Sequence, residues 1–221
     1  MEKGKIIVLE GASDGIGKST QSNLLEERLQ RDGETIIKHH FPTYNKIQGE
    51  LLTKYLKGEF GPIKNQSPYI INSLFAIDRA ITWNYELKKE YEKGKTLLFD
   101  RYTTSSIIYQ GASIEDMDER KAFIDYVCDY EYNKLGIPEA DNVLFLHAPF
   151  DVITKLRESR TVNEGVANDI HERDIEFLKK VYDNAMFVAD YLNWDMIDCS
   201  KNDKMLPIDE IHEKVYSKLK K

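Results

Sequence analysis

The strongest constraint on this chain is a glycine-containing turn near its start, placed between an apolar run and a run with helical spacing. Residues 5–10 read KIIVLE, residues 12–19 read ASDGIGKS, and residues 19–31 carry leucines at helical spacing. A small residue, four intervening residues and then Gly-Lys-Ser predict a phosphate-binding P-loop in this strand–turn–helix setting. Ala12 stands where the strict pattern has glycine, with Gly11 just before it. The loop therefore follows a relaxed pattern or carries one extra residue.

Each residue type in the loop suits an anion. Gly15 and Gly17 let backbone N–H groups turn toward a phosphate, and the following helix points its positive end at the same place. Lys18 can reach the β and γ phosphates, and the Ser19 hydroxyl can ligate Mg²⁺. The alternative to a phosphate-binding loop is a glycine-rich turn in which Lys18 occurs by chance. The residues predicted to hold a nucleoside triphosphate are Ser13, Gly15, Ile16, Gly17, Lys18, Ser19 and Thr20.

Apolar runs alternate with helical patterns along the whole chain. Because the three clearest runs are continuous rather than alternating, they predict strands covered on both faces. We therefore expect one α/β domain over residues 1–221, a three-layer α/β/α fold around a five-stranded parallel sheet. The predicted strands are 5–10, 35–40, 96–100, 142–147 and 195–198, and the predicted helices are 19–31, 68–91, 105–109, 118–135, 149–160, 169–192 and 208–219.

Composition excludes several classes of protein. The 221 residues carry a formal net charge of −7, which argues against a general nucleic-acid binder. No apolar run approaches the roughly eighteen residues that span a bilayer, so we expect no membrane segment. The two cysteines, Cys128 and Cys199, cannot build a disulfide framework. A reducing compartment follows, and we expect the cytoplasm.

The segment 96–101 narrows the chemistry. It is an apolar run that ends in Asp100 and is followed directly by Arg101. A carboxylate at the end of a buried strand is a Walker-B-like arrangement, so Ser19 and Asp100 are the predicted metal-binding residues. Arg101 would lie beside that carboxylate, where its guanidinium suits bidentate contact with a phosphate.

Five motifs now occur in one order. Residues 41–44 read FPTY, residues 74–79 read LFAIDR, residues 100–111 read DRYTTSSIIYQG, residues 140–146 read ADNVLFL, and two arginines follow at 157 and 160. Over about residues 5–195 the chain resembles the thymidylate kinase (dTMP kinase) family of nucleoside monophosphate kinases. The resemblance implies a P-loop NTPase fold with a helical lid at about 154–170, and a homodimer. It implies transfer of the γ-phosphate of ATP to dTMP with Mg²⁺, giving dTDP.

The chain departs from the family pattern in three places. The P-loop is one residue longer, and His147-Ala148 stands where the family has Asp-Val. Gly15 or Ile16 occupies the place that some members fill with a catalytic arginine. The resemblance then implies that Arg157 and Arg160 of the lid supply the basic groups, alongside Asp14, Lys18 and Arg101, as the catalytic set.

The resemblance also implies an acceptor site. For several of its residues, a purely structural role is the alternative to substrate binding. Phe75 and Tyr109 are core aromatics by spacing alone, and Ser105 and Ser106 are equally good helix caps. Asp78 either orients Arg79 or faces solvent. Asp14 either contacts the acceptor sugar hydroxyl, as the resemblance implies, or is only a turn residue. The predicted dTMP-binding residues are Asp14, Phe41, Pro42, Tyr44, Phe75, Arg79, Arg101, Ser105, Ser106, Tyr109 and Gln110.

Two rival functions stay open at this point. A related kinase would act on another nucleotide or on a deoxynucleoside, although a phosphate-gripping Arg101 favours an acceptor that already carries a phosphate. A non-catalytic P-loop regulator would bind ATP without transferring phosphate.

Overall fold

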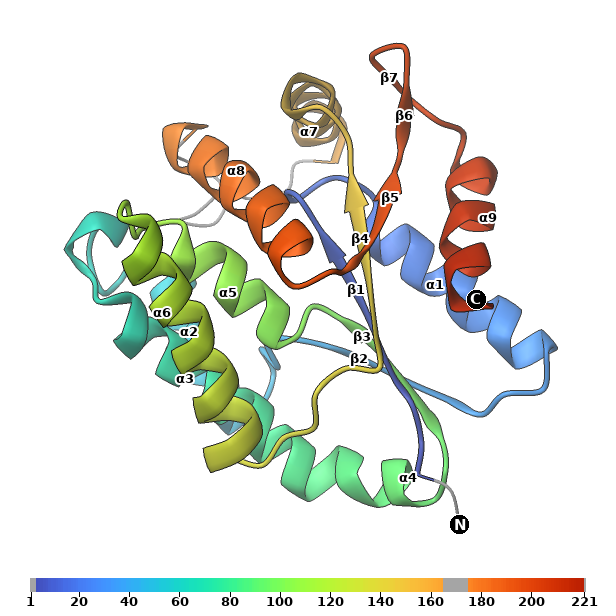
Figure 1. Cartoon of the computed structure of the whole chain (residues 1–221), viewed down its shortest axis with the longest axis horizontal. Helices are drawn as coiled ribbons and strands as arrows, with labels where there is room; N and C mark the ends of the chain where they lie inside the picture. Colours follow the sequence, from blue (N-terminus) through green and yellow to red (C-terminus); the bar gives the residue numbers. More distant parts are fainter. Residues whose placement is uncertain (1–2, 165–174, 221) are drawn as a thin grey trace.

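The computed structural model describes residues 3–164 and 175–220, and of residues 158–164 it describes only the course of the helix. Its centre is a five-stranded sheet in the order β2-β3-β1-β4-β5, with every neighbouring pair parallel. This confirms the predicted fold class. Figure 1 shows the strands running side by side with helices to either side. The strands are β1 (Ile6–Gly11), β2 (Ile36–His40), β3 (Thr96–Asp100), β4 (Asn142–His147) and β5 (Asp195–Asp198).

Helices cover both faces of the sheet. On one side α1 packs against α9, and on the other α5 packs against α3, α6 and α8 (Figure 1). The helices are α1 (Lys18–Arg31), α2 (Glu50–Leu56), α3 (Pro68–Thr82), α4 (Lys88–Glu92), α5 (Thr103–Gly111), α6 (Met117–Cys128), α7 (Phe150–Glu164), α8 (Ile175–Tyr191) and α9 (Ile208–Leu219).

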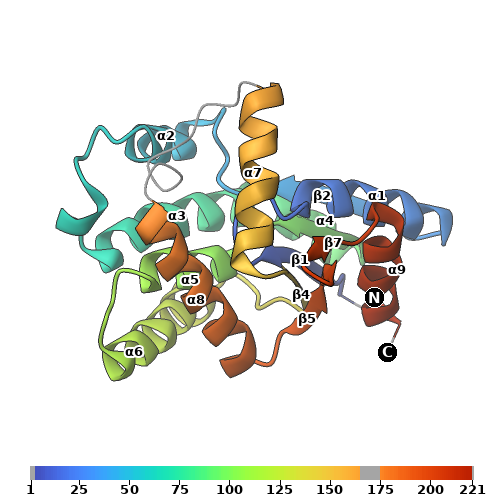
Figure 2. The same ribbon diagram turned by 90° about the horizontal axis from the view of Figure 1, so that it is seen from above.

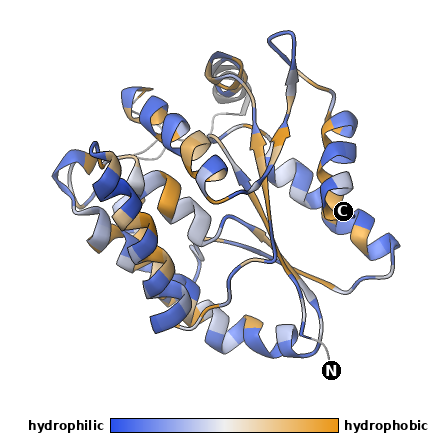
Figure 3. Cartoon of the chain, in the orientation of Figure 1, coloured by the Kyte–Doolittle hydropathy of each residue, from blue (hydrophilic) through white to orange (hydrophobic). Residues whose placement is uncertain are grey.

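The central strand β1 shows why the sequence reads as continuous apolar runs. Its side chains alternate between two faces, and both faces are buried. Ile7 belongs to a core cluster with Leu25 of α1, whereas Val8 belongs to a second cluster with Trp83. Figure 3 shows the strands as the hydrophobic part of the fold and the outer helices as mixed. A strand with a core on each side is apolar along most of its length, and in β1 the one charged residue, Glu10, comes only near the carboxyl end.

Two predicted helices change character near their ends. The helix predicted over 68–91 becomes π-helical in η3 (Trp83–Leu87) before α4, and the one predicted over 118–135 becomes π-helical in η4 (Asp129–Lys134). A wider π turn is not visible in hydrophobic spacing. The predicted start of the helix 169–192 lies outside the described residues, and α8 is described from Ile175.

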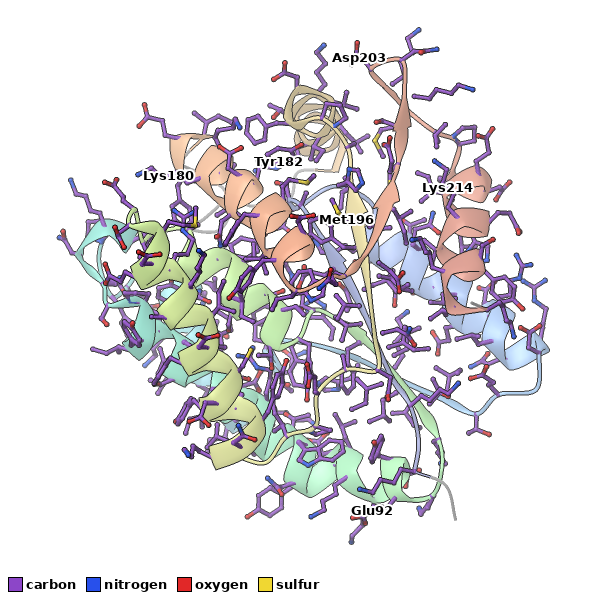
Figure 4. All side chains as sticks on the ribbon, viewed as in Figure 1. Glu92, Lys180, Tyr182, Met196, Asp203 and Lys214 are labelled. Atoms are coloured by element: carbon purple, nitrogen blue, oxygen red, sulfur yellow. The ribbon has the colours of Figure 1, made fainter. Side chains whose placement is uncertain are left out.

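Besides two short 3₁₀ helices, η1 (Ile47–Gly49) and η2 (Ile63–Asn65), two elements were not expected from the sequence. One is α2, which follows the loop after β2. The other is an antiparallel hairpin of β6 (Ser200–Lys201) and β7 (Lys204–Met205), with Asp203 at its tip (Figure 4). Both are too short for periodicity to reveal.

The carboxyl ends of the strands gather the segments that carry chemistry. The P-loop follows β1, Phe41 follows β2, Arg101 follows β3, and α7 follows β4 and projects away from the sheet (Figure 2). This is the edge where parallel α/β sheets bind ligands. None of the helices in the described part of the chain has the length and apolar character to cross a membrane.

Candidate active site

The P-loop connects β1 to α1 through two left-handed residues. Gly15 and Gly17 have φ angles of 88° and 100°, and the helix begins directly at Lys18. A side chain at either position would be strained, so the pattern of glycines follows from the backbone. The loop's Ile16 is buried and packs into the core, which anchors the turn from below.

Lys18 is buried and already paired. Its Nζ lies 3.1 Å from Asp14 Oδ1 and 3.4 Å from the carbonyl oxygen of Ser13. The ammonium group is therefore held inside the curve of the loop, next to the positive end of α1, where a phosphate would meet both.

Ser19 and Asp100, the predicted metal-binding residues, are brought together by the sheet. The Ser19 hydroxyl donates to Asp100 Oδ2 over 2.9 Å, and Asp100 Oδ1 is buried with no hydrogen-bond partner among the described residues. His40 Nδ1 lies 3.4 Å from Oδ2. Burial alone raises the pKa of Asp100, but the contact with His40 and the charge of Lys18 outweigh it, and the pKa falls to about 2.

This oxygen pair fits Mg²⁺. A hydroxyl and one carboxylate are hard donors, and Mg²⁺ in nucleotide sites takes few protein ligands and completes its shell with water and phosphates. In the described residues, three or more His, Cys, Asp or Glu side chains nowhere gather as a dedicated metal cage. The unpartnered Oδ1 of Asp100 leaves one carboxylate oxygen ready for such a shell.

Arg101 sits in a strained backbone conformation at the mouth of β3. Its φ of 70° is left-handed, which a non-glycine residue adopts at a cost of about 1 kcal/mol or more. The guanidinium makes an ion pair with Asp14 and lies over the ring of Tyr109, 5.1 Å from its centroid. This backbone conformation directs the side chain toward Asp14 of the P-loop, and no sequence pattern predicts it.

Asp14 joins the two cationic sites. Its Oδ1 accepts from both Lys18 and Arg101, and its Oδ2 accepts from the Tyr109 hydroxyl at 2.9 Å. Burial alone raises the pKa of Asp14, but the charges of Arg101 and Lys18 outweigh it and hold the pKa far below its usual value. Burial also keeps the pKa of Tyr109 well above its ordinary value, so its hydroxyl stays a donor. Asp14 is therefore a permanent carboxylate between two cations.

Beside this junction lies a partly open cavity whose empty space, including solvent at its mouth, is about 490 Å³. Every residue predicted to bind dTMP lines it, from Phe41 in the loop after β2 to Gln110 on α5. Leu56 and Tyr102 also line it, and sequence reasoning missed both. The structure thus brings the eleven predicted residues together, while their individual roles stay predictions.

The wall made by residues 41–44 is held by Asp78. This side chain is 1 % exposed and accepts a hydrogen bond from the backbone N–H of Thr43 at 2.9 Å. The solvated alternative is wrong because Asp78 is buried, and its hydrogen bond goes to the backbone of Thr43 rather than to Arg79. It instead fixes the loop that carries Phe41 and Tyr44 to α3. Burial raises the pKa of this carboxyl.

Two buried glutamates, neither predicted, organise the hydroxyl and guanidinium groups of the cavity. Glu10 accepts hydrogen bonds from Thr104 and Ser105. Glu131 makes a two-bond pair with Arg79. Ser106 accepts from Arg79. Both serines therefore have protein partners, in place of the helix-capping alternative. A signal for Glu10 existed in its position at the end of a buried strand, but nothing near Glu131 marked it.

The predicted lid begins at α7. A side chain added at Gly15 would lie 2.5 Å from Arg157 Cγ, so the stem of Arg157 packs directly on the P-loop. Arg160 falls on the same helix, but its side chain lies outside the described residues. The rest of the predicted lid, residues 165–170, also lies outside them.

The fold and this junction fit a P-loop kinase that acts on a nucleoside monophosphate, because Lys18 lies at the N-terminus of a helix and Arg101 contacts the same carboxylate of Asp14. The chain belongs to the thymidylate kinase family, whose model matches residues 9–215. The enzyme therefore transfers a phosphoryl group from ATP to dTMP and forms dTDP.

A solved structure agrees with the fold. The chain is similar to the thymidylate kinase from Candida albicans with a TM-score of 0.73 and 22 % identity, over 99 % of this chain and 92 % of that one. At this identity the likeness speaks for the fold alone. The family match carries the function, and it disfavours both the deoxynucleoside kinase and the non-catalytic regulator.

Proposed function

We propose that transfer occurs across Asp14, with Lys18 on the donor side and Arg101 on the acceptor side. The observation that carries this proposal is the double pairing of Asp14 Oδ1 with both cations. Two phosphates that replace this shared carboxylate as partners would lie next to each other. Such positioning is most of what phosphoryl transfer asks of a protein.

On the donor side, the backbone N–H groups of residues 13–20 and the ammonium of Lys18 hold the phosphates of ATP. Arg157 already lies over Gly15, where it can contact the same phosphates as α7 closes. Arg160, from the same helix, is proposed to act with it. A guanidinium there stabilises the charge that develops during transfer and helps to exclude water.

Ser19 and Asp100 would hold Mg²⁺. A bound ion would supply positive charge that neutralises part of the charge on the donor phosphates. The depressed pKa of Asp100 keeps its carboxylate ionised at neutral pH, which a metal ligand requires.

On the acceptor side, Arg101 contacts the phosphate of dTMP, and Asp14 accepts a hydrogen bond from the sugar hydroxyl. Phe75 is half-buried with its ring edge-on to Tyr55, and it lies one helical turn from Arg79 on the same cavity wall. One face of the base would lie on Phe75 while a carbonyl on its edge accepts from Arg79. Tyr109 walls the sugar.

A homodimer is the proposed assembly. Ile70, Ile77 and Tyr85 are exposed along α3 and η3, and Ile47 and Leu51 are exposed on the neighbouring segment. Large apolar side chains in one stripe are typical of a subunit interface. Sedimentation velocity measures the assembly directly, and a monomer at micromolar concentration would contradict it. Cytoplasmic location and single-domain organisation stay predictions; the free thiols of Cys128 and Cys199 suit a reducing compartment.

The test of the reaction is an ADP-release assay with ATP and Mg²⁺ across dTMP, dUMP, dCMP, dGMP and thymidine. We expect the highest kcat/KM with dTMP. Turnover of thymidine without turnover of dTMP would reject the acceptor assignment. ATP binding without transfer to any acceptor would instead indicate a regulator.

A further inference from the structure

The base end of the acceptor cavity contains a closed ion pair, of which the proposed reaction uses only the arginine. Glu131 lies in the π-helical segment η4 and is completely buried, and Arg79 on α3 is 2 % exposed. Their contact has two bonds, because Nε donates to Oε2 and Nη2 donates to Oε1, each over 2.6 Å. Such a fork fixes the plane of the guanidinium as well as its place.

The remaining bonds of the cluster tighten it further. Ser106 Oγ accepts from Arg79 Nη2 at 2.7 Å, and Thr103 Oγ1 donates to Glu131 Oε2 at 2.8 Å. The carboxylate thus receives three hydrogen bonds from two different helices. A buried pair without such support would cost more in desolvation than it returns.

Counting donors shows what is left for a ligand. Nε and Nη2 of Arg79 are taken, whereas Nη1 has only a long contact of 3.4 Å to the Tyr102 carbonyl oxygen. Arg79 nevertheless lines the acceptor cavity. Nη1 is therefore the nitrogen whose protons remain for an acceptor atom there. Arginine has no acceptor of its own, so it can meet a carbonyl but not an amino group.

We infer that Glu131 is a positioning residue that selects the acceptor base. By holding two of the three guanidinium nitrogens, it presents Nη1 alone to the cavity. A base with a carbonyl at that edge gains a hydrogen bond, whereas a base with an exocyclic amino group places donor against donor. This inference rests on the proposed acceptor role of Arg79, and it deepens that role by naming the group that enforces it.

The test is Glu131→Gln, which keeps the size of the side chain and removes its charge. We expect KM for dTMP to rise by about tenfold and the preference for dTMP over dCMP in kcat/KM to fall by about tenfold, because a charge-assisted bond is lost. KM for ATP should stay within about twofold of the wild-type value, since the P-loop is untouched. An unchanged dTMP KM and an unchanged preference in the folded variant would overturn the inference.

Thr103→Val is the matched control. It removes one hydrogen bond from the same buried carboxylate and leaves the pair with Arg79 intact. A merely structural role for the cluster predicts similar kinetics for both variants, whereas positioning predicts loss of preference only in Glu131→Gln. If Glu131→Gln does not fold, Glu131→Asp serves instead. It keeps the charge and draws it back by one methylene, and the same loss or retention of preference decides.

A double variant separates this inference from the proposed function. Arg79→Met with Glu131→Leu removes both buried charges, a replacement that proteins often tolerate. Loss of dTMP preference in the double variant with none in Glu131→Gln would reject only the positioning role. Full preference in the double variant would remove Arg79 itself from base recognition.

Discussion

The two ends of the acceptor cavity each hold an arginine beside a carboxylate, yet the pairs differ in kind. At the base end Arg79 and Glu131 are 2 % and 0 % exposed, and at the phosphate end Arg101 and Asp14 are 17 % and 21 % exposed. The first pair is closed by further protein bonds. The second is open to the cavity, and its carboxylate is shared with Lys18.

This difference teaches which pair is scaffold and which can exchange partners. A fully buried charge needs its partner at all times, because leaving it alone costs several kcal/mol. A partly exposed pair can open toward a ligand phosphate at small cost, since water and the ligand replace the lost contact. The base end should therefore dominate stability, and the phosphate end should dominate catalysis.

The largest contrast is expected between Arg79→Ala and Arg101→Ala. Arg79→Ala leaves Glu131 as a buried charge without a cation and should lower the free energy of unfolding by about 3–5 kcal/mol. Arg101→Ala leaves Asp14 paired with Lys18 and should lower it far less. Urea denaturation measures both values. Equal losses would break the distinction between the two ends.

Lys18→Ala should produce the opposite profile. Removal of a preorganised cation at the transferring phosphate should reduce kcat by about 10²–10³-fold, while the free energy of unfolding changes little. Steady-state turnover and denaturation on the same sample measure the two effects. Lys204→Ala, on the exposed hairpin, is the control and should keep full turnover. Unchanged turnover in Lys18→Ala would refute the P-loop assignment.

Asp100, which precedes Arg101 in the chain, should also make the free energy of unfolding sensitive to acid. The pKa of Asp100 falls from 3.8 to about 2 on folding, so its ionised form favours the native state. The contribution, about 2 kcal/mol, is fully present above the unfolded pKa and is lost as pH falls through the folded one. The stability gap between wild type and Asp100→Asn should therefore close between about pH 4 and pH 2. Parallel pH profiles down to pH 2 would contradict this.

The smallest effect concerns the backbone at Arg101. At a φ of 70°, glycine is free of the strain that any other side chain suffers. Arg101→Gly should be more stable than Arg101→Ala by about 1 kcal/mol, although both lose the guanidinium and should be equally poor with dTMP. Thermal unfolding of the two variants measures the difference. A less stable glycine variant would show that the strain is absent.

Much of the fold was predictable. The five strands and their parallel direction follow from apolar runs, clearest at β1, β3 and β4, alternating with helical spacing, and the bounds of α9 were predicted to the residue. The π-helical segments η3 and η4 were not, because hydrophobic spacing does not distinguish a wider turn from a regular one. Both matter, since η4 carries Glu131.

The candidate site was predicted in part. Its members were named from motifs, and the structure gathers them around one cavity. The partners of those members were not foreseen. Asp78 was expected beside Arg79 or in solvent, but it holds the N–H of Thr43. A motif indicates only partners that are close in the chain. It carries no information about a partner on another element of the fold.

By itself, the sequence determined the donor loop, because all its groups lie within one continuous turn whose backbone conformation glycine and the strand–helix setting dictate. Only the tertiary structure decided how the acceptor end works. Arg79 and Glu131 are 52 residues apart in the chain, and Asp14 and Arg101 are 87 apart. The pairing of buried charges depends on how helices pack on the sheet, and a local pattern carries no information about that packing.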